Sequence, residues 1–190
     1  MEELYRQTDN MLGMKEYLSA YRTKPTDDTP SLQTLLEELG YDFTRDDNNN
    51  LVGMQKSPDP NLPKLTSVLD AYRHAAFSAI EANKRGSTMA ALMGAGKEGI
   101  DAFKFGKGVI TGRNEISNIP KYIDATGTDF YNNRVGRKFS ATKADALKEL
   151  NKVFINQLNR MKDEGTNFKF KENVDFKFAD QSYLKRESLT

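Results

Sequence analysis

The chain has 190 residues and a formal net charge of +1, with 29% charged and 37% hydrophobic residues. This length suffices for one domain with a substantial core, and no apolar run approaches the roughly 20 residues that a membrane helix needs. The composition therefore excludes a membrane-spanning protein, and the start of the chain lacks the basic and hydrophobic segments that would predict a signal peptide.

The absence of cysteine and the single histidine, His74, limit the chemistry available to the chain. Disulfides and thiolate catalysis are excluded. A metal site would need mostly carboxylate ligands, which disfavours zinc and leaves magnesium or calcium as weak options. We expect no metal ion and no cofactor.

The charge is distributed unevenly along the chain. Residues 1–60 carry six Lys or Arg and twelve Asp or Glu, a net charge of −6, so the rest of the chain carries +7. The asymmetry fits an acidic N-terminal module folding onto a basic body, or two faces for different partners. Because the lysines alternate with acids, we do not expect a nucleic-acid partner.

The first sixty residues predict short elements. Apolar spacing predicts a helix over residues 2–21, and Ser31 caps a second helix that Gly40 closes. The segment 41–54 is typical of a small hairpin around an acidic, Asn-rich turn. The proline-containing segment 57–63 is a linker and the best candidate for a domain boundary.

The strongest helical pattern covers residues 62–84. Its apolar stripe consists of Leu65, Leu69, Tyr72, Ala76, Ala79 and Ile80. Asp70, His74, Phe77 and Glu81 fall on the far side of the same helix. This arrangement fits either a central helix covered on two faces or a helix with an exposed outer face.

Three further helices and a hairpin complete the prediction. An alanine-rich helix covers 87–103, another begins at 113–119 and is bent by Pro120, and a third follows a cap at 140–142 and ends near residue 163. Alternating phenylalanines at 168, 170, 176 and 178 predict a β-hairpin with one aromatic face. That face would cover either the chain's own helices or, as we slightly favour, a neighbouring subunit.

These elements define a mainly α protein. We expect a single helical domain with a small N-terminal hairpin and a C-terminal β-hairpin. Its segments would be an acidic N-terminal part, 1–60, a helical core, 61–165, and a C-terminal hairpin with a tail, 166–190.

One polar stretch, 127–139, is unusual for a surface helix. If it is helical, Asp129, Asn133 and Arg137 stand four residues apart and could hydrogen-bond in series. Phe130, Val135 and Phe139 would then point toward the core. Such a polar ladder is either a buried network that stabilises a fold or the floor of a site.

Three segments, 70–79, 114–115 and 129–137, together resemble an uncharacterised helical domain family of bacteria and phages. Its members often lie at the ends of large secreted or toxin-like proteins and read D-A-[FY]-R-H-A, then H-E, then D-x-x-N-N-x-x-G-R. The resemblance covers about residues 65–140. It places the family's polar set on Arg73, His74, Glu115, Asp129, Asn132, Asn133, Gly136 and Arg137. Asn114 stands where the family has His, and the resemblance implies no established activity.

These residues could support several kinds of site. The candidate catalytic residues are Glu115 as general acid or base, His74 oriented by a carboxylate, and Asp129, which opposite Glu115 would form a glycosidase-like pair. The candidate ligand-binding residues are Arg73, Asn132, Asn133 and Arg137. A buried structural network, an active site and a ligand or ion site all remain open. In each case the three segments should meet at one point.

Two functions are consistent with this sequence. The first is a structural or interaction component of a phage particle or similar bacterial assembly, with other protein subunits or copies of itself as partners and the virion as its location. The alternative is an envelope-directed hydrolase that uses Glu115 with Asp129 or His74. Whether the chain is an enzyme stays open at this point.

Overall fold

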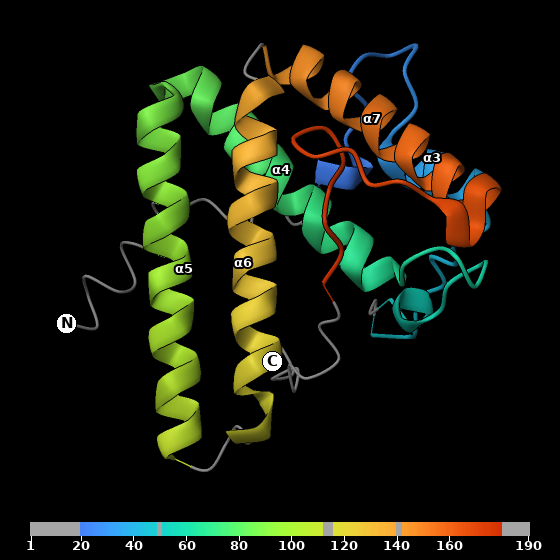
Figure 1. The fold of residues 1–190 in the computed structure, drawn as a ribbon. Helices are drawn as coiled ribbons and strands as arrows, with labels where there is room; N and C mark the ends of the chain where they lie inside the picture. Colours follow the sequence, from blue (N-terminus) through green and yellow to red (C-terminus); the bar gives the residue numbers. More distant parts are fainter. Residues whose placement is uncertain (1–19, 49–50, 112–115, 140–141, 180–190) are drawn as a thin grey trace.

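The computed structural model describes residues 20–48, 51–111, 116–139 and 142–179 (Figure 1). The helix that we predicted over residues 2–21 lies almost wholly outside these ranges, as do residues 112–115. The predicted mainly α class is confirmed.

Five α-helices form the described fold, with short 3₁₀ turns between them. They are α3 (Leu32–Glu38), α4 (Leu65–Arg85), α5 (Ser87–Ile110), α6 (Ile119–Gly136) and α7 (Lys143–Glu164). The 3₁₀ turns are Ala20–Arg22, Gly53–Gln55, Ile116–Asn118, Arg137–Phe139 and Gly165–Asn167. Across the described ranges, none of the helices has the length and apolar character needed to cross a membrane.

Side-chain caps set two of the helix starts, as the sequence predicted. The Ser31 hydroxyl accepts a hydrogen bond from the Thr34 N–H at the start of α3, and Gly40 follows that helix with φ of 95°. The Thr142 hydroxyl accepts the Asp145 N–H at the start of α7. Pro120 lies in the first turn of α6, where its missing N–H breaks no helical bond.

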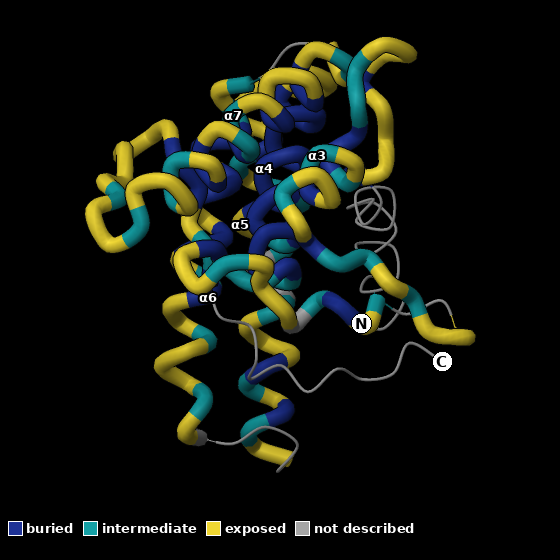
Figure 2. Tube along the Cα trace, turned by 90° about the vertical axis from the view of Figure 1, so that its right-hand side faces the viewer, coloured by how far each residue is buried: buried dark blue, intermediate teal, exposed yellow. Residues whose placement is uncertain are grey.

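Helix α4 is the central element of the fold. It packs against α5, α6 and α7. None of its residues from Leu65 to Ala82 is exposed, so of our two interpretations the central helix with covered faces is confirmed (Figure 2). At its crossing with α6 the backbones nearly touch, since a Cβ on Gly136 would lie 2.3 Å from the Ala75 carbonyl oxygen.

Two apolar clusters hold the described elements together. The larger one joins α3, α4, α7 and the C-terminal segment, and it includes Leu32, Leu36, Leu65, Val68, Tyr72, Leu147, Leu150, Phe154, Leu158 and Phe176. Within it the Tyr72 hydroxyl donates to Asn151 Oδ1 at 2.6 Å. The smaller cluster lies between α5 and α6, where Phe105 stacks on Tyr122 with ring centroids 4.1 Å apart. These two helices run side by side and extend beyond the others (Figure 1).

The predicted N-terminal hairpin is reduced to a single contact. Arg45 and Leu51 form one antiparallel bridge, and the Val52 N–H donates to the Thr44 carbonyl at 2.9 Å. The described residues contain no β-strand.

The predicted C-terminal β-hairpin is wrong. Side chains from two helices, rather than a second strand, form hydrogen bonds with the backbone of this segment. We call residues 168–179 the strap. The Asn132 side chain on α6 donates to the Lys177 carbonyl and accepts the Lys177 N–H, both at 2.9 Å. Gln157 on α7 pairs in the same way with Phe176, at 2.8 and 2.7 Å. Two side-chain amides thus take the place of a neighbouring strand.

The strap's phenylalanines do not share one face. Phe176 is buried and stacks on Phe154 of α7 with centroids 4.0 Å apart, whereas Phe170 is 39% exposed. Asp175, expected on a charged outer face, is buried and pairs with Arg160. Phe176 therefore covers this chain's own core rather than a neighbouring subunit.

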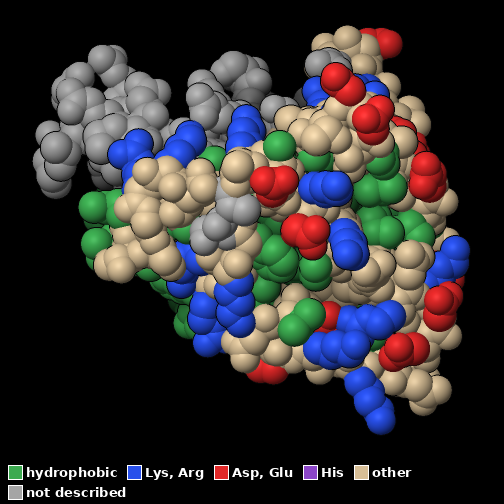
Figure 3. Space-filling view, turned by 90° about the horizontal axis from the view of Figure 1, so that it is seen from above, with side chains coloured by type: hydrophobic (Ala, Val, Ile, Leu, Met, Phe, Trp, Pro, Cys, Tyr) green, Lys and Arg blue, Asp and Glu red, His purple; other side chains and the backbone are tan. Residues whose placement is uncertain are grey.

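Seen from above, the surface carries acidic and basic side chains side by side, with hydrophobic side chains between them (Figure 3). No histidine is visible on this face, in keeping with the burial of His74.

Candidate functional site

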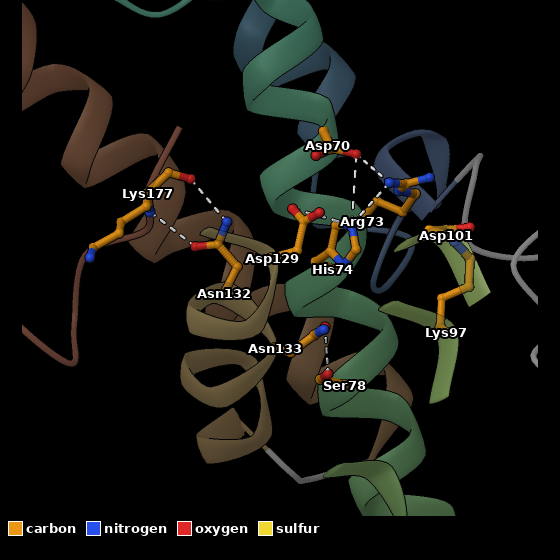
Figure 4. A network of polar contacts seen from close by, with 10 residues as sticks. All are labelled: Asp70, Arg73, His74, Ser78, Lys97, Asp101, Asp129, Asn132, Asn133 and Lys177. Carbon is orange, nitrogen blue, oxygen red and sulfur yellow. Dashed lines mark hydrogen bonds and ion pairs between the residues drawn. The ribbon is translucent and has the colours of Figure 1, made fainter. Parts of the chain in front are cut away.

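The candidate site lies where α4 crosses α6. Helix α4 contributes Asp70, Arg73, His74 and Ser78, and α6 contributes Asp129, Asn132 and Asn133 (Figure 4). Side chains four apart on a helix share one face, so Asp70, His74 and Ser78 follow one another along α4. The close approach at Gly136 brings them within reach of Asp129 and Asn133 on α6.

His74 stands at the centre of this polar cluster. Its Nε2 lies 3.0 Å from Arg73 Nη2, 3.4 Å from Asp129 Oδ1 and 3.8 Å from Asp70 Oδ1. Arg73 also bonds to Asp70. A guanidinium has only donors, so His74 Nε2 accepts the hydrogen bond from Arg73. This nitrogen therefore carries no proton.

Burial lowers the pKa of His74 to about 3, and the positive charges of Arg73 and Lys97 act in the same direction. The carboxylate of Asp70 and a hydrogen bond with Asn133 oppose this shift in pKa without cancelling it. The imidazole is therefore neutral at neutral pH, and its contacts with Asp70 and Asp129 are not ion pairs.

Asn133 links the cluster to two helices. Its Oδ1 accepts a hydrogen bond from the Ser78 hydroxyl at 2.9 Å, and both side chains are buried. A Cβ on Gly94 of α5 would lie 3.3 Å from Asn133 Nδ2. The glycine on α5 thus leaves the space that the amide occupies, and three helices meet at this residue.

The structure brings together only some of the predicted site residues. His74, Arg73, Asp129 and Asn133 gather around one point, as predicted for the first and third segments. Asn132 is buried nearby but bonds to the strap. Glu115 lies outside the described residues.

Arg137 does not extend the predicted series from Asp129 and Asn133. It is half-buried, and its pKa is lowered by burial and then by the charge of Arg134. Within the described ranges, no hydrogen bond or ion pair from its guanidinium is found. Phe130 is exposed, contrary to our prediction, whereas Val135 is buried in the core as predicted.

Sequence reasoning missed the roles of Asn132 and Gln157. Neighbouring residues on a helix point about 100° apart, so Asn132 and Asn133 cannot both face α4. That spacing alone could have separated one amide for the site from one for another element. Nothing in the sequence identifies Gln157 as the second amide.

The arrangement can hold a cation. Asp70, His74 and Asp129 each offer one ligand atom, and these atoms lie within 4.8 Å of one another. The glycosidase-like pairing of Asp129 with Glu115 involves a residue outside the described part of the chain. It therefore stays a prediction.

Comparisons of this chain with models of protein families, with curated proteins and with solved structures find no match. The family resemblance stated from the sequence accordingly stays a prediction. The function has to be argued from the residues themselves.

Proposed function

We propose that this chain is a structural or interaction component of a phage particle or similar bacterial assembly, and that a face of α5 joins it to another subunit. The support is the side of α5 turned away from the rest of the fold. We call it the α5 outer face: Met89, Leu92, Gly96, Gly99, Phe103, Gly106 and Ile110.

Three large apolar side chains on this face are open to solvent. Leu92 is 62%, Phe103 61% and Ile110 87% exposed. At about 100° per residue, the three lie within about 20° of one another around the helix axis. The three side chains therefore form a continuous apolar stripe. Burying this stripe against another molecule would be favourable in free energy.

Glycines fill the positions between these side chains. A Cβ added to Gly96, Gly99 or Gly106 would meet no atom within 4 Å. By the same helical geometry, Lys107 is the one charged residue of α5 within about 60° of the stripe. The face thus alternates large apolar side chains with gaps and is nearly uncharged.

The opposite side of α5 already has its partners. Ala90, Gly94 and Phe105 are buried against the rest of the fold. On α6, Ile119, Ile123 and Phe130 form a second exposed stripe, with spacings of four and seven residues. The two helices therefore bury one side each and leave apolar side chains on another.

The partner that fits the α5 outer face best is a second copy of this chain. Side chains and gaps alternate along one helix, so the face is complementary to itself when two helices pack with ridges in grooves. We therefore expect the purified protein to be an oligomer.

Light scattering coupled to size exclusion tests this function. The double variant Leu92→Glu and Phe103→Glu should be monomeric with an unchanged melting temperature, because both side chains are exposed in the isolated chain. Val52→Glu is the matched control, since Val52 is also exposed but lies away from α5. A wild-type chain that stays monomeric up to high concentration would contradict self-association.

The second candidate is an envelope-directed hydrolase. The observation that favours it is the 3.4 Å approach of His74 Nε2 to Asp129 Oδ1 between two helices. Release of fragments from purified peptidoglycan, compared between wild type and the variants Asp129→Asn and Glu115→Gln, tests it. Equal release by all three would exclude these residues from catalysis.

A further inference from the structure

We propose that Asp70, His74 and Asp129 form a binding site for a first-row divalent metal ion, and that Arg73 occupies this site while the metal is absent. The inference does not depend on the α5 outer face. It rests on the positions of three donor atoms and one guanidinium.

The donor atoms have the separations that a metal ion requires. Ligands at about 2.1 Å from a tetrahedral zinc ion lie about 3.4 Å apart. His74 Nε2 lies 3.4 Å from Asp129 Oδ1 and 3.8 Å from Asp70 Oδ1. All three donors fall within 4.8 Å of one another. The two carboxylates are the most widely separated pair, so one of them would have to move by about 1 Å to close the set around an ion.

The chemistry of the donors favours a particular class of metal, and it differs from the magnesium or calcium that the sequence alone left open. An imidazole suits zinc, iron and nickel, and carboxylates suit manganese as well, whereas magnesium and calcium prefer sites made of oxygen alone. Because His74 Nε2 accepts from Arg73, it carries no proton, and its lone pair could bind a metal ion once the guanidinium moves away. One histidine and two acids would leave positions on the ion for water.

A second layer of contacts holds the histidine in place. Asn133 hydrogen-bonds to His74, and the Ser78 hydroxyl donates to Asn133 Oδ1 at 2.9 Å. Ligand histidines are usually oriented by such a bond to their second ring nitrogen. Ser78 and Asn133 are therefore positioning residues for the metal site.

Arg73 already supplies a positive charge at this point. Its Nη2 contacts both Asp70 and His74 Nε2, while its buried Nε has no hydrogen-bond partner among the described residues. A quarter of the Arg73 side chain is exposed, so the guanidinium has a path to solvent. A metal ion that binds the same atoms would displace it, and the two cations would compete.

Titration calorimetry of the chelator-treated protein with Zn²⁺, Mn²⁺ and Mg²⁺ tests the site. We expect one Zn²⁺ per chain, weaker binding of Mn²⁺, in line with the usual metal order, and no measurable Mg²⁺ binding. Asp129→Asn should weaken Zn²⁺ binding by more than about 100-fold, and Arg73→Met should strengthen it by about 10-fold. Asp124→Asn, the same change at an exposed position of α6, is the control and should bind like wild type.

The single histidine gives a test that needs no variant. Its imidazole signals in an NMR spectrum belong to His74 alone, so Zn²⁺ should shift them and Mn²⁺ should broaden them. Imidazole signals unchanged at saturating Zn²⁺, or equal Zn²⁺ affinity in wild type and Asp129→Asn, would overturn the proposal.

Discussion

Helices α4 and α5 are neighbours joined at Gly86, but their burial is opposite to what their side chains suggest. Helix α4 carries Asp70, Arg73 and His74, yet from Leu65 to Ala82 none of its residues is exposed. Helix α5 turns Leu92, Phe103 and Ile110 to solvent. Position in the fold, rather than composition, decides which helix is inside.

The difference assigns a different role to each helix. α4 has α5, α6 and α7 around it, so its polar side chains need specific partners and can define a site. α5 lies at the edge of the described fold, and its outer apolar side chains are largely exposed. Changes on α4 should therefore affect folding, and changes on the α5 outer face should affect association.

The largest effect is expected at the crossing of α4 and α6. In Gly136→Ala the new Cβ would lie 2.3 Å from the Ala75 carbonyl oxygen and 2.6 Å from its Cα, so the backbones must separate. We expect the free energy of unfolding to fall by roughly 3 kcal/mol or more, measured by urea denaturation. A loss below about 1 kcal/mol would show that this crossing is loosely packed.

Asn133→Leu should have the next largest effect. The change keeps the volume but removes the acceptor of the Ser78 hydroxyl and the partner of His74, so buried polar groups lose their bonds. We expect a loss of roughly 1–3 kcal/mol in unfolding free energy. Asn118→Leu, at the half-buried start of α6 where the side chain forms no capping bond, is the control. Unchanged stability together with a loss of peptidoglycan-fragment release would instead identify Asn133 as a functional residue.

The pH dependence of stability should report His74 directly. Its pKa is lowered from 6.5 to about 3 in the folded state, so below pH 6.5 the unfolded chain binds a proton that the folded chain does not. Stability therefore falls as pH falls, by roughly 1.7 kcal/mol in total between pH 6.5 and pH 5, and the slope approaches about 1.4 kcal/mol per pH unit toward the acid end of this range. Denaturation in the presence of a chelator measures it. His74→Gln should be nearly flat over this range, because the chain has no other histidine.

The smallest effect is expected on the α5 outer face. Gly96→Ala adds a Cβ that meets no atom within 4 Å, and alanine favours a helix over glycine. The isolated chain should gain about 0.5–1 kcal/mol in stability. If Gly96 is a gap that another subunit fills, the same variant should associate more weakly. A destabilised monomer would contradict the exposed position of this residue.

The sequence predicts the helices well because their signals are local. The apolar stripe of α4 and the caps at Ser31 and Thr142 depend on residues within a few positions of one another. The strap was mispredicted for the opposite reason. Alternating phenylalanines indicate an extended chain, but they do not reveal that Asn132 and Gln157, far away in sequence, hold its backbone.

The site was predictable in part. His74, Asp129 and Asn133 meet because their spacings place polar side chains on facing sides of two helices. The expected hydrogen-bond series from Asp129 through Asn133 did not extend to Arg137. Asn133 bonds instead to Ser78 on the facing helix α4. The proximity of Asp70 to Asp129, and the guanidinium of Arg73 beside them, depend on the crossing geometry of two helices and could not be predicted.

The strap has a consequence for the order in which the chain folds. Its backbone pairs with side chains 19 and 45 residues earlier, and among the described residues its internal backbone bonds are turn contacts at Lys171. The strap therefore cannot form before α6 and α7 are in place, and until Phe176 docks, the ring of Phe154 has no cover on that side. Folding should end with this step, so a mutation at Phe176 should speed unfolding and leave the rate of folding unchanged.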